Sequence, residues 1–81
     1  MERILIVDDE SSILELLTEI LSIEGYDIVT AQDGGEALGQ VKSRPFDLVI
    51  TDFRMPVLSG RELYDGALAY NPGMAGRFIF I

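Results

Sequence analysis

The sequence contains no cysteine and no histidine. Without cysteine the chain can form no disulfide and offers no thiolate nucleophile. Without histidine it lacks the commonest general base and the commonest transition-metal ligand. These absences exclude Ser-His-Asp and Cys-His catalysis, and they exclude zinc sites built from cysteine and histidine.

Long hydrophobic runs are also absent. Even the longest uninterrupted ones, such as Ile4–Val7 and Phe78–Ile81, fall far short of the roughly 18 to 20 residues that a helix needs to span a bilayer. The first run ends in acidic residues rather than in the small-residue cleavage site of a signal peptide. We therefore expect a cytoplasmic protein with no membrane segment.

Positive charge is scarce. Six Lys and Arg residues stand against 14 Asp and Glu residues, which gives a net charge of −8. Arg54, Arg61 and Arg77 are scattered along the chain instead of forming a cluster. A chain with this charge repels phosphate backbones, so direct nucleic-acid binding is not expected.

The chain is nevertheless apolar enough to fold. Of its 81 residues, 48% are hydrophobic, which is too many for a chain that is disordered by composition. This length lies near the lower limit, roughly 70 to 80 residues, at which a single core is stable without disulfides, metals or partners. We therefore expect one small acidic domain.

Two hydrophobic patterns alternate along the chain. Short β-branched runs such as Arg3–Val7 are typical of strands buried on both faces. Between such runs, apolar residues recur at helical spacing, as at Ile13, Leu17 and Ile20. The patterns predict strands over 3–7, 26–31, 46–52 and 77–81, and helices over 11–24, 35–43 and 60–70. This alternation indicates right-handed crossovers, and hence an α/β fold with a parallel sheet covered on both faces.

Several residues are suited to begin or end the predicted helices. Asp9 and Ser12 are both candidate N-caps of the first helix, and Gly25 can turn left-handed just past its end. Asp33 is expected to cap the second helix. Gly39 lies inside that helix, where glycine costs about 1 kcal/mol relative to alanine. The second helix is therefore predicted to be the weakest.

Acidic residues follow two of the predicted strands. Asp8 and Asp9 close the first strand, and Asp52 closes the third. Ligands of open parallel α/β sheets bind outside the carboxyl ends of the strands, so these carboxylates converge if the two strands are neighbours. A hard divalent cation with oxygen ligands would relieve their repulsion, and Mg²⁺ is the best candidate. The alternative is that Asp8 and Asp9 only cap the first helix while Asp52 is a solvated strand end.

Two stretches together make the sequence resemble a response-regulator receiver domain. Arg3–Glu10 (RILIVDDE) is similar to the first strand and acidic pair of that family. Asp47–Glu62 is similar to its third strand, phosphoacceptor and following loop, and contains the pattern Asp-x-x-Met-Pro-x-x-x-Gly from Asp52 to Gly60. The resemblance runs over all 81 residues.

The resemblance implies a doubly wound, flavodoxin-like sheet with strand order 2-1-3-4-5. It also implies that a sensor histidine kinase or a phosphotransfer protein donates a phosphoryl group to Asp52. Asp8, Asp9, Asp52 and the backbone carbonyl of Arg54 would hold Mg²⁺. A carboxylate nucleophile needs no activating base. Such a module is not an enzyme beyond helping to transfer and hydrolyse its own phosphoryl group.

Residues of the loop after the third strand have both functional and ordinary interpretations. Met55 and Pro56 can fix the loop beside the phosphoacceptor, or Met55 can simply fill core space. Gly60 permits an unusual backbone angle before the third helix. Thr51 is expected to pack rather than react, and the Arg54 side chain is expected to be solvated.

The sequence departs from the family pattern in its last part. The family's sheet has five strands, whereas this chain stops in the fourth, so we expect the order 2-1-3-4 with strand five missing. The missing part includes a Ser or Thr and a Lys that contact the phosphoryl group, so switching is expected to be impaired. The fourth strand, 77–81, then becomes an exposed apolar edge. Through this edge, or by exchanged elements, the chain is expected to form a homo-oligomer.

Two other functions fit parts of the pattern. A haloacid-dehalogenase-like phosphatase also uses a strand-end Asp and Mg²⁺, but that family has a second Asp two residues after the nucleophile, where Arg54 stands here. The main alternative is a degenerate receiver fragment that serves as an assembly or interaction module. Such a module would keep the fold and the exposed edge without accepting a phosphoryl group.

Overall fold

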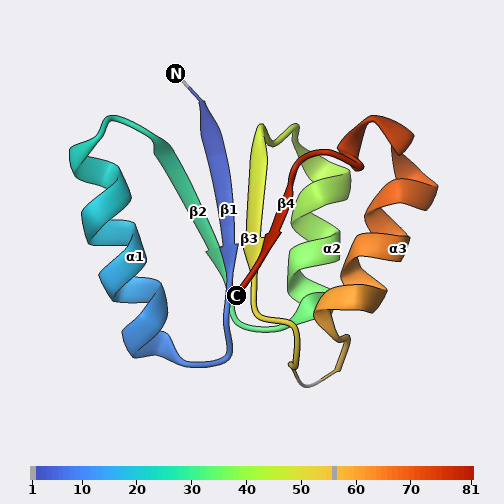
Figure 1. Cartoon of the computed structure of the whole chain (residues 1–81), viewed down its shortest axis with the longest axis horizontal. Coiled ribbons are helices and arrows are strands. Elements are labelled where there is room, and N and C mark those ends of the chain that lie inside the picture. Colours follow the sequence, from blue (N-terminus) through green and yellow to red (C-terminus); the bar gives the residue numbers. More distant parts are fainter. Residues whose placement is uncertain (1, 56) are drawn as a thin grey trace.

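The chain folds into one parallel sheet with helices on both faces, seen here in a computed structural model that describes residues 2–55 and 57–81. Over these residues the elements are β1 (Arg3–Val7), α1 (Ser11–Ile23), β2 (Asp27–Ala31), α2 (Gly34–Ser43), β3 (Leu48–Thr51), α3 (Gly60–Tyr70), the 3₁₀ turn η1 (Pro72–Met74) and β4 (Phe78–Phe80). All neighbouring strands are parallel, and their order is β2-β1-β3-β4. α1 covers one face of the sheet, and α2 and α3 cover the other (Figure 1). The α/β fold and the order 2-1-3-4 are therefore as the sequence predicted.

β1 lies inside the sheet and is buried on both faces. Leu5 and Val7 belong to the core under α2 and α3, whereas Ile4 and Ile6 belong to the core under α1. This alternation follows from the two-residue period of a strand. None of the four side chains is more than 3% exposed. The prediction of a strand buried on both faces is confirmed for β1.

The two cores differ in size. The larger one, between the sheet and the helices α2 and α3, consists of Leu5, Val7, Ala31, Ala37, Val41, Phe46, Val49, Leu63, Ala67 and Met74. The smaller one, under α1, has Ile4, Ile6 and Leu14 as its buried members. Ile79 of β4 pairs with Ile50 on this second face and is 47% exposed. α1 therefore covers only part of its face, and the part near β4 is open.

Three strands are shorter than the sequence predicted. β2 is Asp27–Ala31 rather than 26–31, β3 is Leu48–Thr51 rather than 46–52, and β4 is Phe78–Phe80 rather than 77–81. β4 is short because it pairs only with residues 49–51 of β3. β3 begins at Leu48, which is the first of its residues to pair with β1, opposite Ile4.

The helices deviate less from their predicted ranges. α1 ends at Ile23 rather than at residue 24, and α2 begins at Gly34 rather than at residue 35. α3 spans the predicted residues 60–70. No helix in the described part of the chain is long and apolar enough to cross a bilayer.

The caps were predicted correctly for α2 but not for α1. Oδ1 of Asp33 accepts the backbone N–H of Glu36 (2.7 Å), as expected of an N-cap. At the start of α1, the predicted caps Asp9 and Ser12 are wrong, because Glu10 occupies the N-cap position and makes no side-chain cap bond. Gly25 follows the end of α1 with a φ of 91°, so its left-handed conformation is confirmed.

Candidate metal centre

Asp8 and Asp52 each follow a strand, and the pairing of β1 with β3 places them side by side. Val7 pairs with Thr51, and the N–H of Asp52 donates to the carbonyl oxygen of Val7 (3.0 Å). The N–H of Asp8 donates in the same way to the carbonyl oxygen of Ala31 at the end of β2 (3.1 Å). The backbone ladder of the sheet therefore fixes the positions of both acidic residues.

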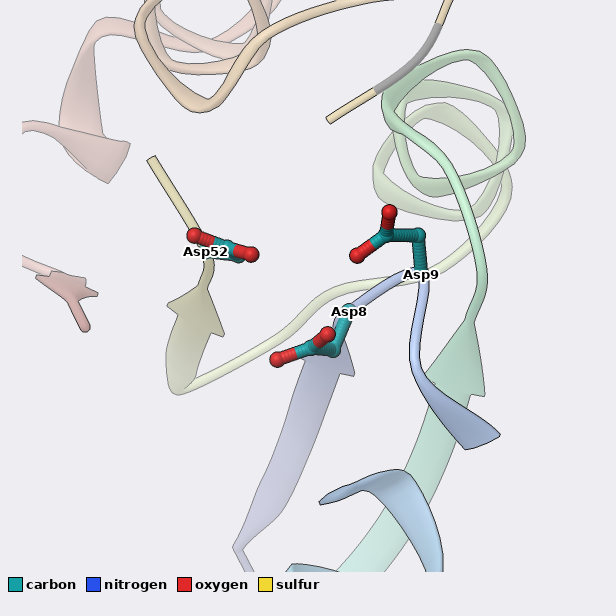
Figure 2. Close-up of side chains that lie close together, drawn as sticks. All are labelled: Asp8, Asp9 and Asp52. Carbon is teal, nitrogen blue, oxygen red and sulfur yellow. The ribbon is translucent and has the colours of Figure 1, made fainter. Parts of the chain in front are cut away.

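Three carboxylates meet at this edge of the sheet. Asp8, Asp9 and Asp52 each offer an oxygen, and these oxygens lie within 4.8 Å of one another. Figure 2 shows the three side chains gathered at the carboxyl ends of β1 and β3. Asp8 is buried, Asp52 is half-buried and Asp9 is exposed, so the cluster is open to solvent on one side. The structure thus brings together the carboxylates that the sequence predicted to converge.

The electrostatics of the cluster favour a bound cation. Burial raises the pKa of the Asp8 carboxyl above its ordinary value, and the negative charges of Asp52 and Asp9 raise it further. The N–H of Glu10, which donates to Oδ1 of Asp8 (2.9 Å), lowers the pKa and so opposes these effects in part. Among the described residues, no Lys or Arg forms an ion pair with the cluster. An all-oxygen donor set with uncompensated negative charge fits a hard divalent cation such as Mg²⁺.

The loop after β3 begins with contacts to Asp52. The N–H of Arg54 donates to Oδ1 of Asp52 (3.3 Å), and the Arg54 side chain is exposed, as expected. In the part of the chain that the structure describes, Oδ2 of Asp52 accepts no hydrogen bond. Thr51 is fully buried, and its hydroxyl donates to the carbonyl oxygen of Asp52 (3.0 Å), so it packs rather than reacts. Met55 packs against the larger core, whereas Pro56 lies outside the described residues.

Gly60 is needed here for a different reason from the predicted one. The expectation of an unusual backbone angle is wrong, because Gly25 is the only glycine in the described ranges with a positive φ. Instead, the backbone of Gly60 lies against the carbonyl group of Asp52, where a Cβ atom would overlap. Glycine therefore allows α3 to begin directly beside the end of β3.

Ser59, which positions the loop, was not predicted as a helix cap. Oγ of Ser59 accepts the N–H of Glu62 (3.1 Å), and Oε1 of Glu62 accepts the N–H of Ser59 (3.1 Å). This reciprocal pair is a capping box, which fixes the point where the loop becomes α3. The signal was present in the sequence as Ser-x-x-Glu over residues 59–62.

Comparisons with known proteins agree with this geometry. Residues 4–74 match the family model of the response regulator receiver domain. A response regulator receiver protein from Anaeromyxobacter sp. (strain Fw109-5) is 40% identical over 79 residues, which are 98% of this chain and 33% of that protein. The chain therefore spans about a third of the length of this curated relative.

Two solved structures show the same fold. A CheY-like response regulator receiver domain protein from Methanospirillum hungatei JF-1 has a TM-score of 0.92 and 38% identity, covering 99% of this chain and 62% of the other. The response regulator protein TrrA from Thermotoga maritima, solved in complex with Mg²⁺-BeF, has a TM-score of 0.86 and 44% identity. That match covers 99% of this chain and 66% of the other.

Proposed function

Because the chain belongs to the response regulator receiver domain family, we propose that it is a phosphoacceptor module of a two-component system and that Asp52 accepts the phosphoryl group. Receiver domains are in general signalling modules rather than enzymes. The observation that carries the proposal is the position of Asp52, a half-buried carboxylate within 4.8 Å of the carboxylates of Asp8 and Asp9. We place this function in the cytoplasm.

The proposed reaction needs only a nucleophile and a donor. A carboxylate oxygen of Asp52 forms a bond to phosphorus while the phosphorus–nitrogen bond of a phosphohistidine breaks, and the imidazole nitrogen keeps the electron pair. The donor is a sensor histidine kinase or a phosphotransfer protein. The N–H of Arg54 holds Oδ1 of Asp52 and leaves the second oxygen to react. Water can later hydrolyse the acyl phosphate, which makes any catalysis limited to the module's own phosphoryl group.

The same residues are suited to hold Mg²⁺. We propose Asp8, Asp9, Asp52 and the backbone carbonyl of Arg54 as its ligands, and the relative TrrA, solved with Mg²⁺-BeF, supports this. When bound, Mg²⁺ supplies positive charge that stabilises the phosphoryl oxygens and the acidic cluster. Buried Asp8 and half-buried Asp52 contribute fixed positions, because the strand ladder holds their backbones.

For the 81-residue chain by itself, we propose acceptance of the phosphoryl group without efficient switching. In the family, a Ser or Thr and a Lys that contact the phosphoryl group come from segments that these residues do not include. The proposal therefore separates the acceptor chemistry, which uses β1 and β3, from the conformational response.

A second candidate function is assembly through β4. Ile79, Phe80 and Ile81 are 47%, 40% and 56% exposed, and β4 forms one edge of the sheet. The carbonyl oxygen of Arg77 and the N–H of Ile81 bond to β3, so the amide groups of alternate residues point away from the sheet. An apolar edge of this kind can pair with another chain, which supports a homo-oligomer formed through β4 or by exchanged elements.

Intact mass spectrometry tests the first function. The chain is incubated with Mg²⁺ and acetyl phosphate, and we expect a single phosphoryl adduct. Asp52→Asn should lose the adduct, whereas Asp65→Asn, which removes an exposed carboxylate on α3, should retain it.

The same samples separate the two functions. If the chain is folded by circular dichroism and gains no adduct, phosphoacceptor function is refuted and assembly is favoured. Light scattering over a range of concentrations then tests assembly. A monomer mass that does not change with concentration would rule out the homo-oligomer.

A further inference from the structure

A cavity of ≈ 310 Å³ lies at the end of the molecule opposite to the carboxylate cluster. It is lined by the C-terminal ends of α2 and α3, by the segments that follow them, and by Arg77 just before β4. These segments precede β3 and β4, so the cavity lies at the amino ends of the strands, whereas Asp52 lies at a carboxyl end. Its volume is at the lower end of the range for small-molecule sites, roughly 300 to 1,000 Å³.

Positive charge gathers at this cavity. Lys42, Arg44 and Arg77 line it, which is half of the six Lys and Arg residues of the chain. No described acidic residue is among the lining residues. None of the three cations forms an ion pair with another residue in the described ranges. In a chain with a net charge of −8, three unpaired cations around one cavity reverse the overall charge locally.

The two helix ends at the cavity reduce this positive charge but do not cancel it. Each helix C-terminus carries roughly −0.5 charge, so α2 and α3 together contribute about −1 against three positive side chains. Two carbonyl oxygens there are already bonded. That of Lys42 accepts the hydroxyl of Tyr70 (3.0 Å), and that of Phe46 accepts an N–H of Arg77 (3.0 Å). The cavity therefore keeps a net positive charge.

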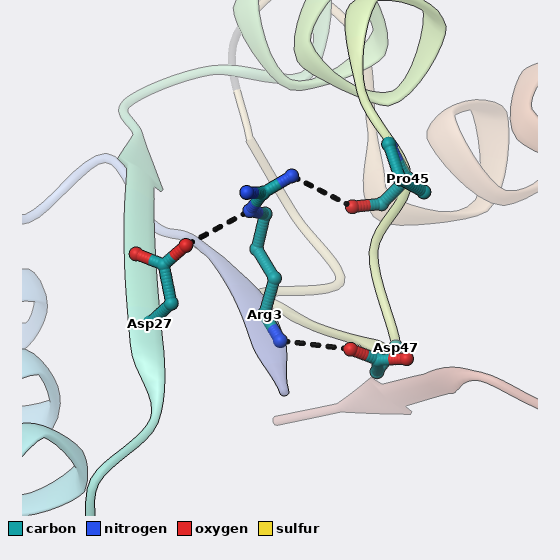
Figure 3. A network of polar contacts seen from close by, with 4 residues as sticks. All are labelled: Arg3, Asp27, Pro45 and Asp47. Atoms are coloured by element: carbon teal, nitrogen blue, oxygen red, sulfur yellow. Dashed lines mark hydrogen bonds and ion pairs between the residues drawn. The ribbon is translucent and has the colours of Figure 1, made fainter. Parts of the chain in front are cut away.

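Acidic residues at the same end of the sheet are engaged elsewhere. Figure 3 shows Arg3 between Asp27 and Asp47. Nε of Arg3 donates to Oδ2 of Asp27 (2.9 Å), and the backbone N–H of Arg3 donates to Oδ2 of Asp47 (2.8 Å). Nη1 of Arg3 also donates to the carbonyl oxygen of Pro45, which lines the cavity (3.5 Å). The guanidinium of Arg3 thus offsets the charge of Asp27, and Asp47 is bonded to a backbone N–H; neither carboxylate is among the residues that line the cavity.

Apolar side chains complete the lining. Phe46 and Met74 are buried, at 1% and 3% exposure, and Tyr70 is 55% exposed. The cavity thus combines an apolar wall with cationic groups, which suits a ligand that has both an anionic and an apolar part.

From this combination we propose that the cavity binds a small organic anion. A phosphate or carboxylate group would contact Lys42, Arg44 and Arg77, since guanidinium groups match the geometry of both anions. The apolar body of the ligand would lie against Tyr70, the exposed aromatic residue of the lining, above a floor formed by the buried Phe46 and Met74. The site is separate from Asp52 and does not depend on phosphorylation.

Amide chemical-shift mapping of the 81-residue chain tests this proposal. The probes are phenylphosphonate, benzoate and the neutral phenol, added without divalent cations so that the acidic cluster repels the anions. We expect at least one anion to shift the amide signals of Lys42, Ser43, Arg44, Phe46, Tyr70, Asn71, Met74 and Arg77, and phenol to leave them unchanged. Comparing phenylphosphonate with benzoate identifies the preferred anionic group.

The double variant Lys42→Gln/Arg44→Gln removes two cations whose side chains make no hydrogen bond with another residue in the described structure. We expect it to bind the anion about tenfold more weakly or worse, the effect of losing charged hydrogen bonds. The control Arg61→Gln removes one positive charge from α3 outside the cavity and should change binding less than about twofold.

Four results would overturn the proposal. The first is that neither anion shifts these signals. The second is that the double variant binds the anion as well as the original chain does, and the third is that phenol shifts the same signals as strongly as the anion. An equal loss of binding in the Arg61→Gln control would likewise show general charge attraction instead of a site. None of these readouts involves Asp52, so they are independent of the phosphoacceptor function.

Discussion

Gly60, the first residue of α3, lies directly against the carbonyl group of Asp52. A Cβ atom on Gly60 would be 2.5 Å from the carbonyl oxygen of Asp52 and 3.0 Å from Cα of Phe53. The N–H of Gly60 also donates to the carbonyl oxygen of Phe53 (2.9 Å). The start of α3 therefore sets the backbone position of the proposed phosphoacceptor.

Gly60→Ala should displace the backbone at Asp52 and weaken both Mg²⁺ binding and phosphorylation. We expect the free energy of unfolding to fall by about 1 to 3 kcal/mol, the usual effect of overpacking a tight contact. Urea denaturation measures the stability, and intact mass with acetyl phosphate measures the acceptor activity. A Gly60→Ala variant as stable and as active as the original chain would show that the contact has no such role.

Gly39→Ala should have the opposite effect on stability and serves as a matched control. Gly39 is exposed within α2, and a Cβ atom there would meet nothing within 4 Å. Alanine also has the higher helix propensity, so we expect the free energy of unfolding to rise by about 0.5 to 1 kcal/mol. The urea midpoint should increase, and a decrease would contradict the environment described for α2.

Val57→Asn should also stabilise the chain. Val57 has a φ of 71° and is 79% exposed, so this β-branched residue adopts a left-handed conformation without gaining burial. That conformation costs roughly 1 to 2 kcal/mol for most L residues, and asparagine adopts it more readily. We expect a gain of about 1 kcal/mol in unfolding free energy. Val57→Thr keeps the branched side chain and should show no gain, so equal stability of the two variants would argue against strain at this position.

Asp8→Asn should stabilise the chain at pH 7 in the absence of divalent cations. The pKa of Asp8 is raised in the folded state, chiefly by burial, so the folded chain binds this proton more tightly than the unfolded chain. Protonated Asp8 therefore contributes its whole stabilisation at pH values below its pKa in the unfolded chain. This stabilisation is lost as the pH rises through the pKa of Asp8 in the folded chain. The amide of asparagine resembles the protonated acid, so the advantage of the variant should shrink as the pH falls toward 3.8.

Urea denaturation at several pH values, with and without Mg²⁺, checks this prediction. Mg²⁺ at 100 times its dissociation constant should stabilise the original chain by about 2.7 kcal/mol, and the variant by much less. Asp65→Asn is the control without Mg²⁺, because Asp65 is an exposed carboxylate on α3 that does not belong to the cluster. If Asp8→Asn lowers stability at pH 7 without Mg²⁺, the carboxylate is not under the electrostatic strain described here.

The sequence predicted those features that depend on local pattern and on general rules of parallel sheets. Asp8 and Asp52 could be expected to meet because each ends a buried strand and carboxyl ends of parallel strands share an edge. Asp33 and Gly25 could be recognised as helix-terminal residues because their roles depend on neighbours a few positions away.

Features that depend on tertiary contacts were not predictable in this way. The role of Gly60 depends on how closely α3 approaches the end of β3, which spacing along the chain does not reveal. Arg77 was one of three arginines that looked scattered along the chain, yet it lines one cavity with Lys42 and Arg44 because α2 and α3 end at the same side of the sheet. Their grouping is visible only once the fold is known.

The inner position of β1 affects how the chain can fold during synthesis. Val7 pairs with Thr51, 44 residues later, so β1 cannot complete its pairing until β3 has been made. At about 5 to 20 residues per second, this separation corresponds to roughly 2 to 9 s of translation. During that interval the apolar residues Ile4–Val7 are protected on one side at most, by β2. The proposed site is likewise assembled late, because Asp8 and Asp52 can come together only after Asp52 has left the ribosome.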